Sequence, residues 1–486
     1  RDAFNWEGAF VYDGKVYDHI KYRLRQANDR YGLAGKRSFR FRFNRGNFIR
    51  CHDNYGRPYP VAWRTLNTGK MFDNLRVGNF GLTETINFAL WNLVGVPAPW
   101  VYTFHYRVIQ RADEAPAGAN GQYYGDFHGM ANVYEDYDAR FIDTHGLADG
   151  NLYKLKDGIF DPSQLMRNQG RYAVKNGADF QNIRANLRPT QTPNWLNAHV
   201  NYEVWYRYHA VVEGIRHYDF VPADSHSKNR AWYFEPDYSQ TPYGRLWTLP
   251  WDTDASWGPN WNNGIDYSKA AIWSGVGREP FRVAYRNNMR EFRHLVWTEE
   301  VIERMIDDLA ERIRVFAMAD RDRWRAAPAA VGTQDFGAME TKVADMKRFA
   351  FVSWSGSTGP AVPQGGRALY LDQLAAAEGD AGKIPATPAA FYTGPEGFPM
   401  DALTFAAGDY SDPQNDPFGA MRWRLGAITP PGAPFDPAVP RVYEVPAVWE
   451  AESTAYARDV TIPMTVVVPG TLYRVRVKMM DATGRW

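Results

Sequence analysis

The chain has 486 residues, with 56 Lys plus Arg against 55 Asp plus Glu and a formal net charge of +1. This length suffices for about two or three domains with buried cores. The balanced charge gives no overall field favouring nucleic acid or a membrane surface, so we expect no nucleic-acid partner. No apolar run reaches the ~18 residues of a transmembrane segment, and the single Cys51 excludes an intramolecular disulfide. Because the sequence opens on Arg1 and stops at Trp486 after a strand-like run, we expect a processed or cropped fragment.

Two N-terminal runs, residues 16–25 and 38–43, alternate apolar and charged positions and predict β-strands with a basic face. A solvated outer face is the simpler interpretation of either strand alone. Together, two basic strands separated by the Gly-containing loop 31–36 could instead present Arg and Lys to nucleotide phosphates. The candidate residues for that role are Lys36, Arg40 and Arg42.

The next segments carry alternating helix and strand patterns. Residues 82–95 have helical periodicity, and we expect this helix to pack in the core. Residues 100–108 predict a strand, and Asn120-Gly121 predicts a hairpin that leads to the run at 130–134.

Glu135 follows that run, just ahead of a helix-like segment at 138–142. Its carboxylate could hold a phosphate-binding cation in place or cap the helix, and its position alone favours the cap. Residues 152–156 predict another short strand, with Lys154 and Lys156 on one face.

The most informative stretch begins after a long predicted helix at 193–217. A polar loop follows, and then two apolar runs at 231–234 and 246–251 with a turn-rich segment between them. This pattern predicts a β-hairpin, which would bring its two outer ends together. The polar residues at those ends are Asp224, His226, Asn229, Asp252 and Asp254.

Phosphoryl transfer needs a carboxylate that receives the acceptor proton, and an amide and a carboxylate that hold Mg²⁺. Asp224 and Asn229 are five positions apart, and Asp252 follows the predicted hairpin, which is the protein-kinase arrangement. A polar turn without chemistry is the simpler interpretation of the loop, and His226 suits a structural role there. A glycosidase or carbohydrate-binding protein using Asp252 and Asp254 is a weaker alternative, because hydrolytic carboxylates lie ~5–9.5 Å apart across a sugar.

The amino-acid composition of the C-terminal part changes twice, near residues 327 and 384. After helical patterns at 281–325, residues 327–383 are rich in Ala, Gly and Pro and predict a linker with short helical elements. Residues 384–486 hold recurring β-rich runs between turns, which predicts a β-sandwich module truncated near its end.

Five segments in order resemble the spore-coat protein H (CotH) kinase-like family, whose members are atypical protein kinases. The resemblance covers roughly residues 10–320. The segments are GKRSFRFRF at 35–43, the stretch 125–142 that ends in YEDYDARFI, NLYK at 151–154, DSHSKN at 224–229 and PWDTD at 250–254. The end of the chain, at 473–477 and 481–486, resembles a fibronectin type III-like strand and its following turn.

The resemblance implies an α+β fold, with an atypical protein-kinase-like two-lobed domain over residues 1–326 followed by the β-sandwich. It implies ATP and Mg²⁺ or Mn²⁺ as cofactors and transfer to Ser or Thr of a protein. By position Asp224 would be the catalytic carboxylate, and Glu135 would hold the phosphate-binding cation. Asn229 and Asp252 would be metal ligands, with Asp254 a further candidate.

One departure from the family pattern concerns the basic strand, where Arg40 and Arg42 stand at positions expected to include Lys. Lys36, Lys154 or Lys156 could supply the charge instead. The sequence therefore leaves two functions open. The first is a secreted or cell-envelope kinase whose C-terminal module contacts the cell surface or matrix. The second is a catalytically degenerate kinase-like adhesion or binding protein.

Overall fold

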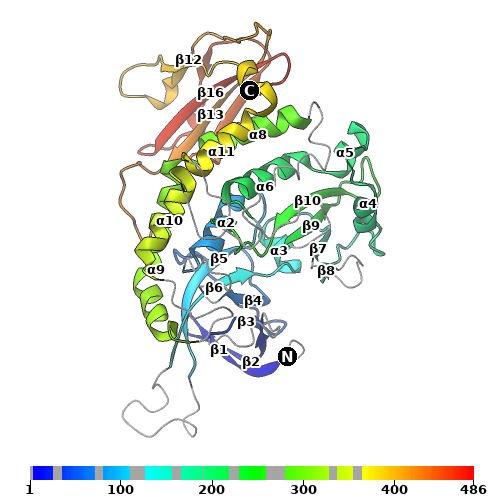
Figure 1. Cartoon of the computed structure of the whole chain (residues 1–486), viewed down its shortest axis with the longest axis vertical. Helices are drawn as coiled ribbons and strands as arrows, with labels where there is room; N and C mark the ends of the chain where they lie inside the picture. Colours follow the sequence, from blue (N-terminus) through cyan, green and yellow to red (C-terminus); the bar gives the residue numbers. More distant parts are fainter. Residues whose placement is uncertain are drawn as a thin grey trace.

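The computed structural model describes residues 4–25, 36–69, 71, 80–109, 126–155, 166–188, 190–217, 229–258, 279, 281–327, 337–353 and 364–486. Within these residues the chain mixes helices with four β-sheets, which confirms the α+β class (Figure 1). None of the helices described is long and apolar enough to cross a membrane.

The N-terminal sheet is antiparallel and has six strands in the order β1-β2-β3-β4-β6-β5. Both basic runs predicted at the N-terminus are strands of this sheet. One face packs over a small aromatic core that includes Phe43, Trp63 and Tyr102. The strands are β1 (Trp6–Tyr12), β2 (Lys15–Leu24), β3 (Phe39–Arg42), β4 (Thr65–Gly69), β5 (Val101–Arg107) and β6 (Phe127–Glu135).

The second sheet has four strands in the order β10-β9-β7-β8. The predicted hairpin is present: β9 and β10 pair antiparallel, and Arg230 lies opposite Pro250 at their outer end. The strands are β7 (Asn151–Leu155), β8 (Met166–Asn168), β9 (Arg230–Glu235) and β10 (Arg245–Pro250).

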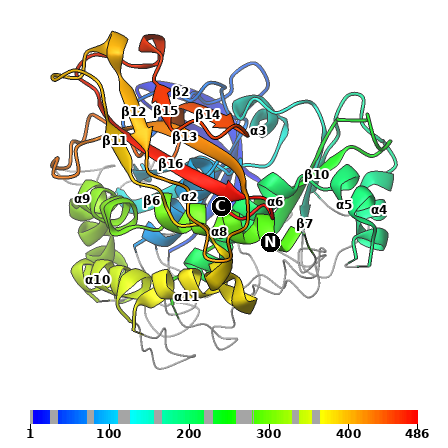
Figure 2. The same ribbon diagram turned by 90° about the horizontal axis from the view of Figure 1, so that it is seen from above.

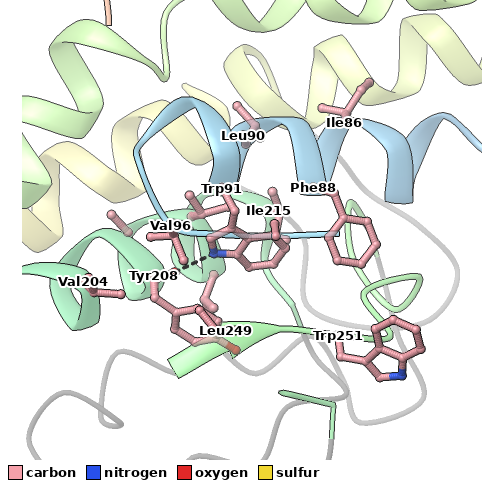
Figure 3. Packing of buried hydrophobic residues seen from close by; sticks show 14 of the residues in the cluster. Ile86, Phe88, Leu90, Trp91, Val96, Val204, Tyr208, Ile215, Leu249 and Trp251 are labelled. Carbon is pink, nitrogen blue, oxygen red and sulfur yellow. Dashed lines mark hydrogen bonds between the residues drawn. The ribbon is translucent and has the colours of Figure 1, made fainter. Parts of the chain in front are cut away.

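Helices surround this second sheet and share its large core. Helix α2 lies against α6, where Trp91 Nε1 donates to the carbonyl oxygen of Tyr208 at 3.2 Å (Figure 3). The helices up to this point in the chain are α2 (Leu82–Leu93), α3 (Ala139–Thr144), α4 (Ala178–Asn186), α5 (Pro193–His199) and α6 (Tyr202–Ile215).

The single long helix predicted at 193–217 is wrong, because the chain breaks between α5 and α6. Val200 is extended and bridges to Leu246 of β10. Asn201 then caps α6, accepting a hydrogen bond from the backbone N–H of Val204 at 3.2 Å. An Asn side chain that satisfies the backbone in this way competes with helix continuation, and the apolar periodicity does not reveal it.

The segment 327–383, predicted as a linker with short helical elements, contains packed helices over its described part. Two helices there, α10 (Met339–Phe351) and α11 (Gly366–Ala375), bury Met346, Phe349 and Leu371 in the same core as α6. They pack against α9 (Glu299–Trp324) and α8 (Phe281–Leu295), and a 3₁₀ turn at Ala377–Lys383 follows. The described helices of this segment therefore pack with the first domain, and they correspond to the helical elements expected there.

The C-terminal module consists of two three-stranded sheets that share a core containing Phe405, Trp449 and Val475. This packing agrees with the predicted β-sandwich, while its likeness to fibronectin type III modules stays a prediction, as does the two-lobed kinase-like fold. One sheet holds β11 (Ala390–Tyr392), β12 (Thr404–Ala407) and β15 (Asp459–Thr461). The other holds β14 (Ala447–Ser453), β13 (Phe418–Ile428) and β16 (Leu472–Asp481).

The C-terminal module lies beside α8 (Figures 1 and 2). Ion pairs join it to α8 and α9. Arg441 lies 2.7 Å from Asp308, and both side chains are mostly buried. Partly exposed pairs join Arg474 to Glu300 at 3.0 Å and Lys478 to Glu291 at 2.7 Å. The module is thus a docked unit rather than a tethered one.

Candidate functional site

The outer end of the β9–β10 hairpin gathers two of the predicted metal ligands. Asn229 directly precedes Arg230, and Asp252 follows Pro250 by two residues, so the register of the hairpin places both at one end. Both residues have left-handed backbones, with φ of 64° at Asn229 and 54° at Asp252. Asn and Asp tolerate this conformation better than other side chains, and such conformations recur at functional sites. The predicted residues Asp224 and His226 lie outside the described part of the chain.

The segment that carries Asp252 alternates exposed and buried residues. Asp252 is exposed and Asp254 partly so, whereas Thr253 between them is fully buried. Tyr137, just after β6, donates its hydroxyl to the carbonyl oxygen of Pro250 at 2.5 Å. The chain is therefore held directly before Asp252 by a residue of the loop that connects the two sheets.

Asn87 of α2 holds the same segment from the other side. Its Nδ2 donates to the carbonyl oxygen of Thr253 at 2.9 Å, to the Thr253 hydroxyl at 3.2 Å and to Ser256 Oγ at 2.9 Å. Its Oδ1 accepts from Trp257 Nε1 at 2.7 Å. Asn87 is fully buried, so these bonds fix the chain that follows Asp252 onto α2.

Lys154 brings a positive charge to this end of the second sheet. It lies on β7 opposite Ala231 of β9, and its Nζ is 3.3 Å from the ring centroid of Trp251. The residue is partly exposed, but burial of its ammonium lowers the pKa of Lys154 to about 7, against the raising effect of Asp136 and Asp252. Nearby Arg25 and Arg40 also lower it. A lysine with such a pKa beside two carboxylates marks a candidate functional site.

Arg40 is ion-paired with Asp136, the residue after β6. Burial raises the pKa of Asp136, but Arg40, Lys154 and Arg25 outweigh burial and bring it below its usual value. The sequence predicted that Glu135 would hold a phosphate-binding cation. In the structure the adjacent Asp136 makes such a contact, with Arg40.

Glu135 makes different contacts. Its Oε2 accepts from the backbone N–H of Trp100 at 3.2 Å and lies 2.9 Å from His145 Nε2. It does not cap α3 either, because the N-cap is Asp138, which accepts from the backbone N–H of Arg140. Side chains of adjacent residues point to opposite sides of an extended chain, which separates Glu135 from Arg40 and Asp136. The capping role predicted for Glu135 is therefore wrong, and its role in holding a phosphate-binding cation stays a prediction.

Lys36 is fully buried instead of facing the site. Its Nζ lies 2.5 Å from Asp320 Oδ1 of α9 and donates to the carbonyl oxygen of Met130 at 2.6 Å. Burial lowers the pKa of Lys36 to about 8, and Asp320 partly offsets this. These contacts count against the prediction that Lys36 binds phosphate.

Arg42 is exposed on the same face of β3 as Arg40, and its neighbours across the strands are Lys21 and Thr65. Burial and three surrounding Arg residues lower the pKa of Arg42 from its ordinary value. The basic face predicted from the sequence exists, but phosphate binding by Arg42 stays a prediction. Lys156 lies outside the described residues.

The donors at the hairpin end fit a hard divalent cation. A carboxylate at Asp252, an amide at Asn229 and a second carboxylate at Asp254 supply the oxygen ligands that Mg²⁺ and Mn²⁺ prefer. Lys154 lies on β7, which pairs with β9, and Arg40 lies on β3 of the N-terminal sheet. Both side chains are cationic groups of the kind that bind the phosphates of a nucleotide.

A cavity of about 480 Å³ lies elsewhere, between α2, α9 and the loop before β14. Its walls include Ile86, Leu309 and Tyr443, and none of the predicted site residues lines it. The hairpin end therefore stays the better-supported place for phosphate chemistry.

These features describe a mixed α+β protein with clustered acidic and basic groups at the junction of two sheets. Residues 33–350, well over half of the chain, match the sequence profile of the family described as CotH kinase protein, and the chain belongs to this family. A search of curated proteins returned no match. The family match ends in α10, beyond the boundary at 326 that the sequence predicted.

Three contributors to the site were missed from the sequence: Asn87, Asp136 and Tyr137. Asn87 carried a usable signal, because it stands three and four residues before the buried Leu90 and Trp91 of α2. A polar residue on the apolar side of a helix needs a buried partner. Asp136 and Tyr137 lay inside the recognised YEDYD segment without a role.

Proposed function

We propose that this protein is an atypical protein kinase that transfers the γ-phosphate of ATP to a Ser or Thr hydroxyl of a secreted or cell-surface protein. The observation that carries the proposal is the register of the β9–β10 hairpin, which brings Asn229 and Asp252 to one end. Lys154 joins them from β7. Membership of the CotH kinase protein family supports the same chemistry.

In the proposed mechanism Asn229 and Asp252 hold a divalent cation, with Asp254 as a further ligand. When bound, the ion neutralises the phosphate charge that develops during transfer. Lys154 donates to the phosphates as a point charge, and Arg40, positioned by Asp136, offers a planar donor pair. Asp224 orients the acceptor hydroxyl and takes its proton.

The test is incubation with γ-labelled ATP and Mg²⁺ or Mn²⁺, alone and with an acidic protein acceptor. We expect label to enter protein with the parent chain and not with Asp252→Ala. Asp224→Asn should abolish transfer and leave nucleotide binding largely intact. Transfer by Asp252→Ala at the parent rate would refute the assigned site.

A second candidate is a degenerate kinase-like adhesion or binding protein, in which the C-terminal module makes the surface contact. This second function is favoured because two of the basic residues predicted to bind phosphate already form ion pairs within the protein. Lys36 is buried against Asp320, and Arg40 is paired with Asp136. Measurable Mg–ATP binding without any transfer would support this second function, whereas transfer to protein would exclude it.

A further inference from the structure

Three carboxylates converge at one end of the C-terminal module. Asp412 and Asp416 lie in the loop before β13, and Asp481 ends β16. Strand pairing of Phe418 with Asp481 brings the loop and the strand end together. One oxygen from each carboxylate lies within 4.8 Å of the other two.

Two of these carboxylates are buried with one oxygen unsatisfied. Asp481 is 0% exposed, and its Oδ1 accepts from the N–H and the hydroxyl of Thr483 and from the N–H of Arg485. Its Oδ2 has no hydrogen-bond partner in the described chain. Asp412 is 9% exposed, and its Oδ2 is likewise without a partner there.

No basic side chain forms an ion pair with these three carboxylates within the described residues, although Arg290 of α8 lies near enough to feel the charge of Asp481. Arg485 is four residues after Asp481, but its guanidinium is directed to Asp380 at 3.2 Å and to Thr483 Oγ1 at 2.6 Å. Buried carboxylates this close together are costly unless a cation accompanies them.

We propose that Asp412, Asp416 and Asp481 form a binding site for a divalent cation of the Ca²⁺ type. The donors are all oxygen atoms, which selects hard cations. Ca²⁺ accepts six to eight oxygen ligands in adaptable geometry, whereas Mg²⁺ demands a near-ideal octahedron. Backbone carbonyls and water would complete the shell.

A cation bound at this site would strengthen the attachment of the C-terminal module to α8. The turn after Asp481 delivers Gly484, whose carbonyl oxygen accepts from Asn287 Nδ2 of α8 at 2.8 Å. The N–H of Trp486 donates to Asn287 Oδ1 at 3.0 Å. A cation bound by Asp481 would order this turn and so strengthen the docking on α8.

The test uses the full chain carrying Asp252→Asn, which disables the metal site proposed at the hairpin. Calcium binding is measured by isothermal titration calorimetry, and thermal unfolding is followed in EDTA and in excess Ca²⁺. The variants Asp416→Asn and Asp412→Asn are added separately to this chain. The matched control is Asp409→Asn, whose side chain is 82% exposed near the same loop.

We expect Ca²⁺ to bind the Asp252→Asn chain and to raise its unfolding midpoint, with affinity falling by about tenfold or more in Asp416→Asn and Asp412→Asn. Asp409→Asn should bind like its parent. In EDTA, Asp416→Asn should unfold at or above the parent midpoint, because it relieves repulsion without breaking a hydrogen bond. Absence of Ca²⁺ binding, or binding unchanged in both variants, would overturn the proposal.

Discussion

Asn87 of α2 donates hydrogen bonds to both the carbonyl and the hydroxyl of Thr253, the residue that follows Asp252. The two residues are 166 positions apart in the chain. Helix α2 thereby holds the segment that bears a proposed metal ligand, and a displacement of α2 would move that ligand.

Replacing Asn87 with Ala should lower the free energy of unfolding by about 1–3 kcal/mol, because buried groups of Thr253, Ser256 and Trp257 lose their partner. It should also weaken Mg–ATP binding, since Asp252 is no longer held. Urea unfolding and calorimetric titration measure the two effects. The control is Asn92→Ala on the same helix, which breaks hydrogen bonds to Ala98 instead. Equal loss of nucleotide affinity in both variants would argue against a positioning role for Asn87.

Replacing Lys154 with Met should stabilise the fold while weakening nucleotide binding. The pKa of Lys154 is about 7 in the folded chain against an ordinary value of 10.5, so the unfolded chain binds more protons between these values. The destabilisation by Lys154 is fully present below pH ~7 and is lost as the pH rises toward 10.5. Urea unfolding at several pH values should show the advantage of Lys154→Met shrinking across this window. A constant advantage would contradict the assignment.

Nucleotide affinity should also depend on whether the amine of Lys154 is protonated. Below pH ~7 the ammonium of Lys154 is already formed, whereas above it binding of phosphate must take up a proton. Mg–ATP affinity is then expected to fall by up to about tenfold per pH unit above neutrality. Lys154→Arg stays charged and should flatten this dependence in calorimetric titrations; parallel profiles for parent and variant would exclude Lys154 as a phosphate ligand.

For the buried ion pair of Lys36 and Asp320 we expect an effect on stability and none on nucleotide binding. Lys36→Met leaves the Asp320 carboxylate buried and unpaired, which should cost about 3–5 kcal/mol of unfolding free energy. The double variant Lys36→Met/Asp320→Leu should recover much of this stability, and its Mg–ATP affinity should match the parent. A stable double variant that no longer binds nucleotide would restore Lys36 as a phosphate ligand.

The hairpin could be predicted from the sequence because its signals are local. Two apolar runs with a turn-rich segment between them define β9 and β10, and the register then carries Asn229 and Asp252 to one end. The basic strands of the N-terminal sheet were predictable for the same reason, since an alternation of period two is visible in a few residues.

The contacts that complete the site join single residues far apart in the chain, and such pairs have no periodic signature. The same is true of a buried ion pair away from the site, because Lys36 and Asp320 are 284 positions apart and neither position indicates the pairing. The Ala- and Gly-rich composition of residues 327–383 predicted a linker with only short helical elements. In the structure Phe349 and Leu371 are buried in the core that α6, α8 and α9 share. Tertiary packing thus overrode local composition there.

The central claim is that the outer end of the β9–β10 hairpin binds a metal–nucleotide complex. Calorimetric titration of ATP in the presence of Mg²⁺ should show binding to the parent chain and a loss of affinity of about tenfold or more in Asp252→Asn, because a charged metal ligand is removed. Asp237→Asn, at the opposite end of the same hairpin, should bind like the parent. Parent-like affinity in Asp252→Asn, or no nucleotide binding by the parent, would contradict the account.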